Sequence, residues 1–400
     1  MSTTAKHQVL IVGGGTAGIT VAARMLRKGY TDVAVIEPSD KHYYQPLWTL
    51  VGGGQAKAAS TERAESSVMP KGANWIRKAV SAFDPDNNTV TCTDGATYGY
   101  DVLVVAPGIQ LDWDDYEGLE SALGHGGVSS NYRFDLAPKT WDFIRNTRSG
   151  TAVFTMPTGG VKCAGAGQKI AYLAADHWRK TGVLKDIDVH LVVPGPRIFG
   201  IPGIADNLDK VIAGYGITLH TESELKAVDA DARKASISAV GPSGSDLMLP
   251  YDVLHVVPRQ SAPEWIKSSP LSTGDAGGYV AVDKHTMQHV RYANVFALGD
   301  VASSPNAKTG AAVRKQAPVV VENLIAHLQR RPLTASYDGY SSCPIVTSSH
   351  DMLLAEFDYD LNLKPSFPGL DPTKPHRAYW YLKKYGLPFL YWNLMLKGLA

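Results

Sequence analysis

The chain has 400 residues and a formal net charge of +1, from 39 basic and 38 acidic side chains. This length exceeds what one hydrophobic core usually serves, so we expect two domains. The balanced charge provides no electrostatic footprint for nucleic acid, and we expect no nucleic-acid partner. The three cysteines, Cys92, Cys163 and Cys343, are too few for a disulfide framework and lack the spacing of a zinc site, so we expect no metal.

We expect no cleaved secretory signal at the N-terminus, because the polar stretch MSTTAKHQ is followed directly by a short apolar run. No apolar segment reaches about 18 residues, so a transmembrane helix is not expected. Any contact with a membrane would therefore be made at its surface.

Residues 7–37 predict a βαβ unit, with a buried strand, a glycine turn, a helix and a second strand that ends in Glu37. The pattern Gly13-x-Gly15-x-x-Gly18 opens the helix, as in the Rossmann fingerprint. Gly13 permits the tight turn, Gly15 lets a pyrophosphate approach the backbone, and Gly18 lets the helix meet the strand. Glu37 would accept hydrogen bonds from a ribose. The alternative is a tight turn in an unrelated α/β domain.

Strands and helices alternate through the rest of the body, which predicts an α/β fold with parallel sheets and two Rossmann-like dinucleotide-binding domains. The sequence pattern of the strand near residue 295 resembles that of the first domain's strands, so we expect the second domain to be inserted in the first. The predicted units are an FAD-binding domain at 1–110 and 285–335, a second Rossmann-like domain at 111–284, and an aromatic C-terminal segment at 336–400.

The cofactor expected at the first site is FAD. The apolar strand that ends in Gly299-Asp300 resembles the second flavin motif of two-domain flavoproteins, whose aspartate holds the ribityl chain. A helix N-cap is an alternative role for Asp300, and both roles can hold together. In the second domain the corresponding strand leads into Pro157 and Cys163 instead of a glycine fingerprint, and proline removes a backbone donor. We therefore expect an electron donor other than NAD(P)H.

Cys163 is expected to be reactive, because a thiol at a helix N-terminus with Lys162 and Lys169 nearby has a lowered pKa. Two-electron thiol chemistry needs a second cysteine, and Cys343 is the candidate, although it can meet Cys163 only through tertiary folding. On these residues alone, the alternative is a pair of small buried cysteines without chemistry.

Five stretches are long and distinctive: HYYQPLWTLVGGG, VKCAGAGQK, NVFALGD, YDGYSSCPIVTSSHDMLLAEFDY and PFLYWNLMLKG. Together they resemble the sulfide:quinone oxidoreductases, and more closely the type II branch that includes the mitochondrial enzyme, within the flavoprotein disulfide reductases. The resemblance runs nearly end to end. It implies a flavoprotein that oxidises hydrogen sulfide to sulfane sulfur and reduces a membrane quinone.

The resemblance also implies roles for the two cysteines. Cys163 would lie beside the reactive edge of the flavin and Cys343 would carry the sulfane sulfur, with the resting pair joined directly or through a bridging sulfur atom. An acceptor such as sulfite, a small thiol or cyanide would then remove the sulfur. Cys92 is expected to be inert.

Cofactor contacts follow from the same resemblance. Lys169 would sit beside the flavin, with a solvated first-turn lysine as the alternative, and Val80 would offer its backbone to adenine, with a buried strand valine as the alternative. The full implied set is Gly13, Gly15, Thr16, Ala17, Gly18, Glu37, Gln45, Val80, Lys169, Asp300 and Gly310.

The tail at 379–400 mixes aromatic residues, leucines and lysines, which suits the headgroup boundary of a membrane. We expect a monotopic contact, with the bacterial cytoplasmic membrane or the mitochondrial inner membrane as candidate locations. The alternative is a helix packed on its own core or on a partner subunit, and a homodimer is one such arrangement.

Two other functions stay open on the sequence. One is a type II NADH:quinone dehydrogenase, which the missing second glycine loop disfavours. The other is a flavin-binding redox sensor without turnover, which the presence of both cysteines disfavours.

Overall fold

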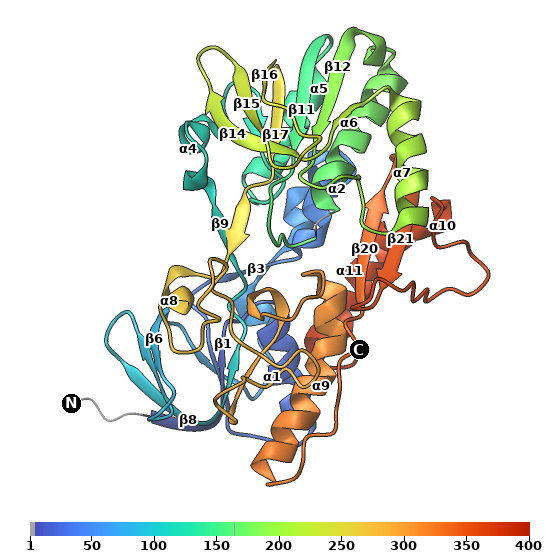
Figure 1. Ribbon diagram of the computed structural model, residues 1–400. Coiled ribbons are helices and arrows are strands. Elements are labelled where there is room, and N and C mark those ends of the chain that lie inside the picture. The colour runs from blue at the N-terminus through green and yellow to red at the C-terminus, as the bar shows by residue number, and fades with distance from the viewer. Residues whose placement is uncertain (1–4, 164) are drawn as a thin grey trace.

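The computed structural model describes residues 5–163 and 165–400 (Figure 1). A seven-stranded sheet forms the first half, in the order β5-β2-β1-β8-β7-β6 with β19 beside β8. β1 pairs in parallel with both β2 and β8, and its residues 9–12 are buried on both faces, which explains their continuous apolar run. The strands are β1 (Ala5–Val12), β2 (Val33–Ile36), β5 (Asn74–Ile76), β6 (Val80–Asp84), β7 (Thr89–Cys92), β8 (Thr97–Val105) and β19 (Val295–Ala297).

A second, five-stranded sheet is parallel throughout, in the order β10-β17-β11-β12-β13. Its strands are β10 (Val128–Ser129), β11 (Gly150–Thr155), β12 (Ile187–Val192), β13 (Thr218–His220) and β17 (Val253–Val256). The helices of this half are α4 (Leu119–Ala122), α5 (Leu136–Asn146), α6 (Ala166–Thr181) and α7 (Pro202–Tyr215). An antiparallel sheet adds β14 (Ser223–Asp229), β15 (Lys234–Ala239) and β16 (Leu247–Pro250).

Two antiparallel strands, β9 (Gln110–Asp112) and β18 (Arg259–Ser261), carry the chain between the two halves (Figure 1). The predicted α/β fold class with two Rossmann-like units is therefore confirmed. The first half also contains α1 (Thr16–Arg27), β3 (Lys41–Tyr43), β4 (Glu62–Ala64), α3 (Glu65–Val68), α8 (Glu264–Lys267) and α9 (Gly310–Leu328), whereas α2 (Trp48–Gly52) packs against α5 and α6 of the second half.

The C-terminal segment contacts both halves. Its hairpin, β20 (Ser341–Val346) and β21 (Met352–Phe357), lies beside α6 of the second half (Figure 1). The last helices pack against the first half, where the guanidinium of Arg24 on α1 donates to the Ala400 carbonyl at 2.5 Å. These last elements are a π-helical turn at Leu382–Gly386, α11 (Leu387–Asn393) and a 3-10 turn at Met395–Lys397, and they follow α10 (Arg377–Tyr381), which packs against β21.

The structure divides the aromatic residues of the tail into two sets. Trp380, Tyr391 and Trp392 are buried, whereas Tyr381, Tyr385 and Phe389 are 54, 59 and 62% exposed. The buried set agrees with the alternative of a helix packed on its own core, and the exposed set leaves an aromatic face. Across residues 5–163 and 165–400, no helix has the length and apolarity needed to cross a membrane.

Candidate active site

The glycines of the turn after β1 serve two different purposes: some are required by the packing of the protein itself, and one leaves open space. Gly13 has φ +101°, and a Cβ there would lie 2.4 Å from the Ala106 carbonyl oxygen, so the protein's own packing requires glycine. A Cβ on Gly18 would lie 1.8 Å from the Gly13 carbonyl oxygen. Gly15 differs, because a Cβ there would meet no atom within 4 Å. The space in front of Gly15 is therefore open, at the start of α1, where a helix N-terminus favours a phosphate.

Glu37 directly follows β2 and lies beside this turn. Its two carboxylate oxygens accept hydrogen bonds from the backbone amides of Gly14 and Ser39, both at 2.7 Å. Burial raises the pKa of Glu37, against the effect of these two amides. The carboxylate is thus held in one orientation at the edge of the turn.

A cavity of about 490 Å³ begins at the glycine turn and is shared by both halves and the C-terminal segment. Its wall includes seven of the eleven residues predicted to bind the cofactor: Gly15, Thr16, Ala17, Gln45, Lys169, Asp300 and Gly310. Gly13, Gly18, Glu37 and Val80 lie outside this wall, and Val80 sits in β6, paired with Cys92. The cavity also reaches Cys163 and the apolar side chains of Leu382, Leu387 and Leu390.

Cys163 lines this cavity and meets Cys343, which is buried behind it and lies 180 positions further along the chain. Cys163 Sγ lies 3.9 Å from Cys343 Sγ, and both are free thiols. Cys163 precedes α6 in the left-handed conformation, at φ +50°, and its amide donates to the Lys308 carbonyl at 2.8 Å. The absence of a side chain at Gly165 leaves room for Cys343, because a Cβ there would lie 2.5 Å from Cys343 Sγ. Cys92, the third cysteine, is buried in β7.

The two thiols differ strongly in acidity. A hydrogen bond from Cys343, together with Lys169, holds the pKa of Cys163 well below its usual range, although burial opposes this. The same hydrogen bond, together with burial, raises the pKa of Cys343 well above its usual range. Lys169 is 2% exposed, and its Nζ lies 3.1 Å from Cys163 Sγ. Cys163 is therefore the thiolate of the pair and Cys343 the thiol.

The sequence attributed the low pKa of Cys163 to Lys162 and Lys169 together, and the structure assigns direct contact to Lys169 alone. Lys162 Nζ turns away and donates to the Gln45 side chain at 2.8 Å. Its backbone carbonyl accepts from the Tyr132 hydroxyl at 3.0 Å, which helps to fix the loop.

Lys383 is one of the tail lysines that the sequence predicts at a membrane boundary, and for this residue the prediction is wrong. It is 2% exposed, and its Nζ donates to the Pro46 carbonyl at 2.7 Å. Burial, with repulsion from Lys169, lowers the pKa of Lys383 to about 7. A lysine in an aromatic stretch gives no local signal of burial, so only the tertiary structure identifies it.

A buried polar chain connects the tail to the glycine turn. The Tyr391 hydroxyl lies 2.9 Å from Thr16 Oγ1 and 2.6 Å from His42 Nε2, and His42 Nδ1 lies 3.1 Å from Glu65 Oε2. His42, Glu65 and Tyr391 are all under 5% exposed. Sequence reasoning missed this chain because its members come from four separate segments.

Residues 7–318 match the pyridine nucleotide-disulphide oxidoreductase family. The mitochondrial sulfide:quinone oxidoreductase of Dictyostelium discoideum is 43% identical over 98% of this chain and 86% of its own length. The mitochondrial sulfide:quinone oxidoreductase of Mus musculus is 39% identical over 98% of this chain and 87% of its own length. This chain belongs to the sulfide:quinone oxidoreductase family.

A solved member of the sulfide:quinone oxidoreductase family has the same fold. The crystal structure of the sulfide:quinone oxidoreductase from Aquifex aeolicus matches with a TM-score of 0.81 over 98% of this chain and 92% of its own, at 21% identity. The predicted family is thereby confirmed, and the chain is an oxidoreductase of this class.

Membership of this family implies a flavin cofactor, and the residues of the cavity fit such a group. The open space at Gly15 suits a phosphate, and Thr16 and Ala17 continue the wall there. Asp300, in the turn after β19, faces the same cavity, and burial raises the pKa of its carboxyl group. The wall thus combines an open helix N-terminus, which suits a phosphate, with a buried carboxyl group at Asp300, which suits a hydroxyl.

Proposed function

We propose that the chain oxidises hydrogen sulfide and transfers the electrons through FAD to a quinone, with Cys163 and Cys343 as the redox pair. The observation that carries the proposal is the contact of two sulfur atoms with opposite pKa shifts, beside a buried lysine, at the wall of a cavity that begins at the Gly13–Gly18 turn. FAD is proposed in preference to FMN because the Gly13–Gly18 turn and Glu37 match the sequence pattern of a dinucleotide site.

The acidity of the pair determines the direction of attack. In the closed form, hydrosulfide forms a bond to the sulfur of Cys343 and the Cys163–Cys343 bond breaks, so that Cys163 leaves as a thiolate. The thiol of lower pKa is the better leaving group, and Lys169 stabilises the charge that appears on Cys163. Cys343 then holds a persulfide, whose outer sulfur passes to an acceptor such as sulfite, a small thiol or cyanide.

When bound, a flavin would accept the two electrons released as the cysteine pair closes again, and would pass them to a quinone. The protein's own part is to hold the two sulfurs near closing distance. Their separation of 3.9 Å exceeds the bond length of about 2.05 Å and also the roughly 3.3 Å between the outer atoms of a bent S–S–S bridge. A resting pair joined directly or through one sulfur atom therefore requires the two sulfurs to move closer together.

The loop after β11 is unsuited to a nicotinamide nucleotide. The amide and the hydroxyl of Thr158 both donate to the Glu224 carboxylate, at 2.9 and 2.8 Å, and Arg259 donates to the same group. Glu224 is 6% exposed, so a negative charge already occupies the donors that a phosphate would use. This observation disfavours the NADH:quinone dehydrogenase alternative.

We also propose that the tail lies on a membrane. Tyr381, Tyr385 and Phe389 are spaced by four residues, which places their exposed rings on one face of the last helices. Leu387 and Leu390, from the same helices, line the cavity. A quinone could thus pass from the lipid boundary to the cavity along the tail. The proposed location is the surface of the bacterial cytoplasmic membrane or the mitochondrial inner membrane.

The test is an anaerobic titration of the flavin-loaded protein. Sulfide is expected to bleach the visible flavin absorbance, whereas NADH is expected to leave it unchanged. Cys163→Ser and Cys343→Ser are each expected to abolish quinone reduction nearly completely, and Cys92→Ser is the matched control with unchanged turnover. Normal turnover of both site variants would refute the cysteine mechanism.

A further inference from the structure

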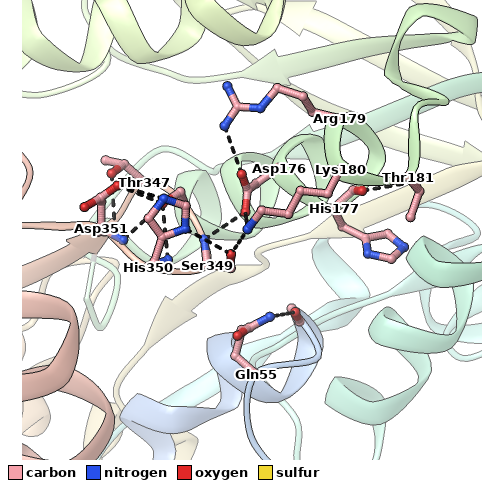
Figure 2. A network of polar contacts seen from close by, with 12 residues as sticks. Gln55, Asp176, His177, Arg179, Lys180, Thr181, Thr347, Ser349, His350 and Asp351 are labelled. Atoms are coloured by element: carbon pink, nitrogen blue, oxygen red, sulfur yellow. Dashed lines mark hydrogen bonds and ion pairs between the residues drawn. The ribbon is translucent and has the colours of Figure 1, made fainter. Parts of the chain in front are cut away.

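The turn between β20 and β21 is attached to α6 by a buried carboxylate, Asp176. One carboxylate oxygen accepts from the backbone amide of Ser349 in that turn, at 2.9 Å, and from Lys180 Nζ at 2.8 Å. The other oxygen accepts from Arg179 at 2.9 Å. Figure 2 shows Asp176 between these partners, with the turn approaching from the hairpin and both basic residues from α6 itself.

A second contact extends the attachment. The Tyr215 hydroxyl, at the end of α7, donates to the Thr347 carbonyl at 2.9 Å and lies 3.4 Å from the Asp176 carboxylate. Lys180 also contacts the Ser349 hydroxyl. Asp176 is fully buried, and although burial opposes it, these donors lower its pKa to about 2. A buried carboxylate with this many donors is costly to disturb, because removing one partner leaves the others unpaired.

The same two elements also meet at the cysteines. α6 begins just after Cys163, and the backbone amide of Gly165 hydrogen-bonds to the Cys343 thiol. Asp176 follows Ala166 by ten residues, which is about 15 Å along the helix. α6 and β20 pack side by side between these two points. The hairpin is therefore held to α6 at both ends, by the sulfur contact at one and by Asp176 at the other.

We propose that Asp176 is a positioning residue for the cysteine pair: its carboxylate fixes the β20–β21 turn to the helix that follows Cys163, and so keeps Cys343 within closing distance of Cys163. The inference rests on the redox role proposed above for the two cysteines. The sulfurs are 3.9 Å apart and must approach to about 2.05 Å to bond, so their effective concentration depends on how firmly the hairpin is held.

The competing explanation is that Asp176 only stabilises the fold. The two explanations differ in what they predict for the thiol–disulfide equilibrium of the pair. Asp176→Asn replaces one acceptor oxygen by an NH2 group, which cannot accept from Lys180 or from the Ser349 amide. If Asp176 positions the hairpin, this change disfavours the closed form; if it only stabilises the fold, the equilibrium stays unchanged while the protein remains folded.

The test uses the full flavin-loaded chain equilibrated in glutathione buffers of graded GSSG/GSH ratio. Glutathione disulfide oxidises the two thiols to the disulfide and yields two molecules of reduced glutathione. The closed fraction is read by alkylation and intact mass. Asp176→Asn is expected to lower the equilibrium constant for closure roughly tenfold, which corresponds to about 30 mV. Tyr215→Phe, which removes the bond to the Thr347 carbonyl, is expected to shift it in the same direction by a smaller factor.

Val90→Ala is the matched control, because Val90 is fully buried in β7, on the other half of the molecule. It is expected to lower the free energy of unfolding without moving the closure constant. If Asp176→Asn does not fold, Tyr215→Phe still decides the question. If the closure constant of the folded variants stays within twofold of wild type, or if Val90→Ala shifts it equally, the inference about Asp176 is overturned. The proposed cysteine mechanism is not affected by that outcome. A wild-type pair that never closes overturns the proposed cysteine mechanism as well.

Discussion

Lys169 Nζ lies 3.1 Å from Cys163 Sγ in the wall of the cavity, where Lys169 is buried and Cys163 is partly buried. The ammonium group favours the thiolate, and the thiolate in turn raises the pKa of Lys169 despite its burial. The two groups therefore hold opposite charges around neutral pH.

Lys169→Met should raise the pKa of Cys163, because it removes the nearest positive charge while keeping most of the side-chain volume. The rate of Cys163 alkylation by iodoacetamide at pH 6 to 7 should fall about tenfold or more, with the pH profile displaced upward. Lys210→Met, at an exposed position on α7, is the control and should leave the profile in place. An unshifted profile in Lys169→Met would assign the low pKa to other groups.

Gly165→Ala should separate the two sulfurs. The backbone of Gly165, at φ −77°, accepts alanine without strain, but the new Cβ would lie 2.5 Å from Cys343 Sγ. We expect sulfide oxidation to fall by roughly 100-fold, in line with the cost of about 1 Å of misplacement at a reacting centre. Gly160→Ala is the control in the same loop, since its Cβ would meet nothing closer than 3.5 Å. Equal activity of the two variants would contradict this account of the site.

The sequence predicted the parts of this site that depend on local pattern. A single βαβ unit is enough to recognise the turn from Gly13 to Gly18 and the acid at Glu37. The same holds for the second domain, where the loop after the first strand lacks the glycine fingerprint. The pairing of Cys163 with Cys343 was a hypothesis from the residues, and the resemblance strengthened it. The structure brings these two sulfurs within 3.9 Å.

What the sequence could not predict depends on tertiary burial. Lys383 and Lys384 are neighbours, yet the first is buried at the site and the second is partly exposed beside Trp380. Glu224 and Asp176 look like ordinary charged residues of a strand and a helix. The partners of Glu224, and the contacts of Asp176 with Ser349 and Tyr215, come from segments that are distant in the chain. No local period or spacing therefore distinguishes these two acids from surface charges.

Lys383 should give the protein a specific pH dependence of stability. Its pKa is about 7 in the folded protein and near 10.5 when exposed, so the unfolded chain binds more protons between these values. The free energy of unfolding that Lys383 contributes therefore rises with pH across this window. Measured by urea unfolding, the difference between wild type and Lys383→Met should grow by roughly 2 kcal/mol from pH 7 to pH 9. The same difference for Lys384→Met should stay flat; a flat difference for Lys383→Met would mean that Lys383 stays charged in the folded state.

Tyr391→Phe should weaken the binding of the flavin without unfolding the tail. The variant keeps the ring but removes the hydroxyl that contacts Thr16 Oγ1 and His42 Nε2. Losing a buried hydrogen-bond partner costs about 1–3 kcal/mol, so the dissociation constant of the flavin should rise about tenfold. Flavin fluorescence released on dilution measures this, and Tyr385→Phe, at a 59% exposed position, is the control. Equal retention in both variants would show that the tail does not position Thr16.

The exposed aromatic face of the tail should determine membrane binding. Replacing Tyr381, Tyr385 and Phe389 together by serine removes three large exposed rings while leaving the buried rings in place. Because binding at the lipid boundary scales with the apolar area inserted, flotation with vesicles of phosphatidylcholine and phosphatidylglycerol should fall at least about tenfold. Turnover with a water-soluble short-chain quinone should change little. Met248→Ser with Val290→Ser removes exposed apolar side chains from elsewhere on the surface and should leave flotation unchanged. If the triple variant floats like wild type, another surface makes the contact.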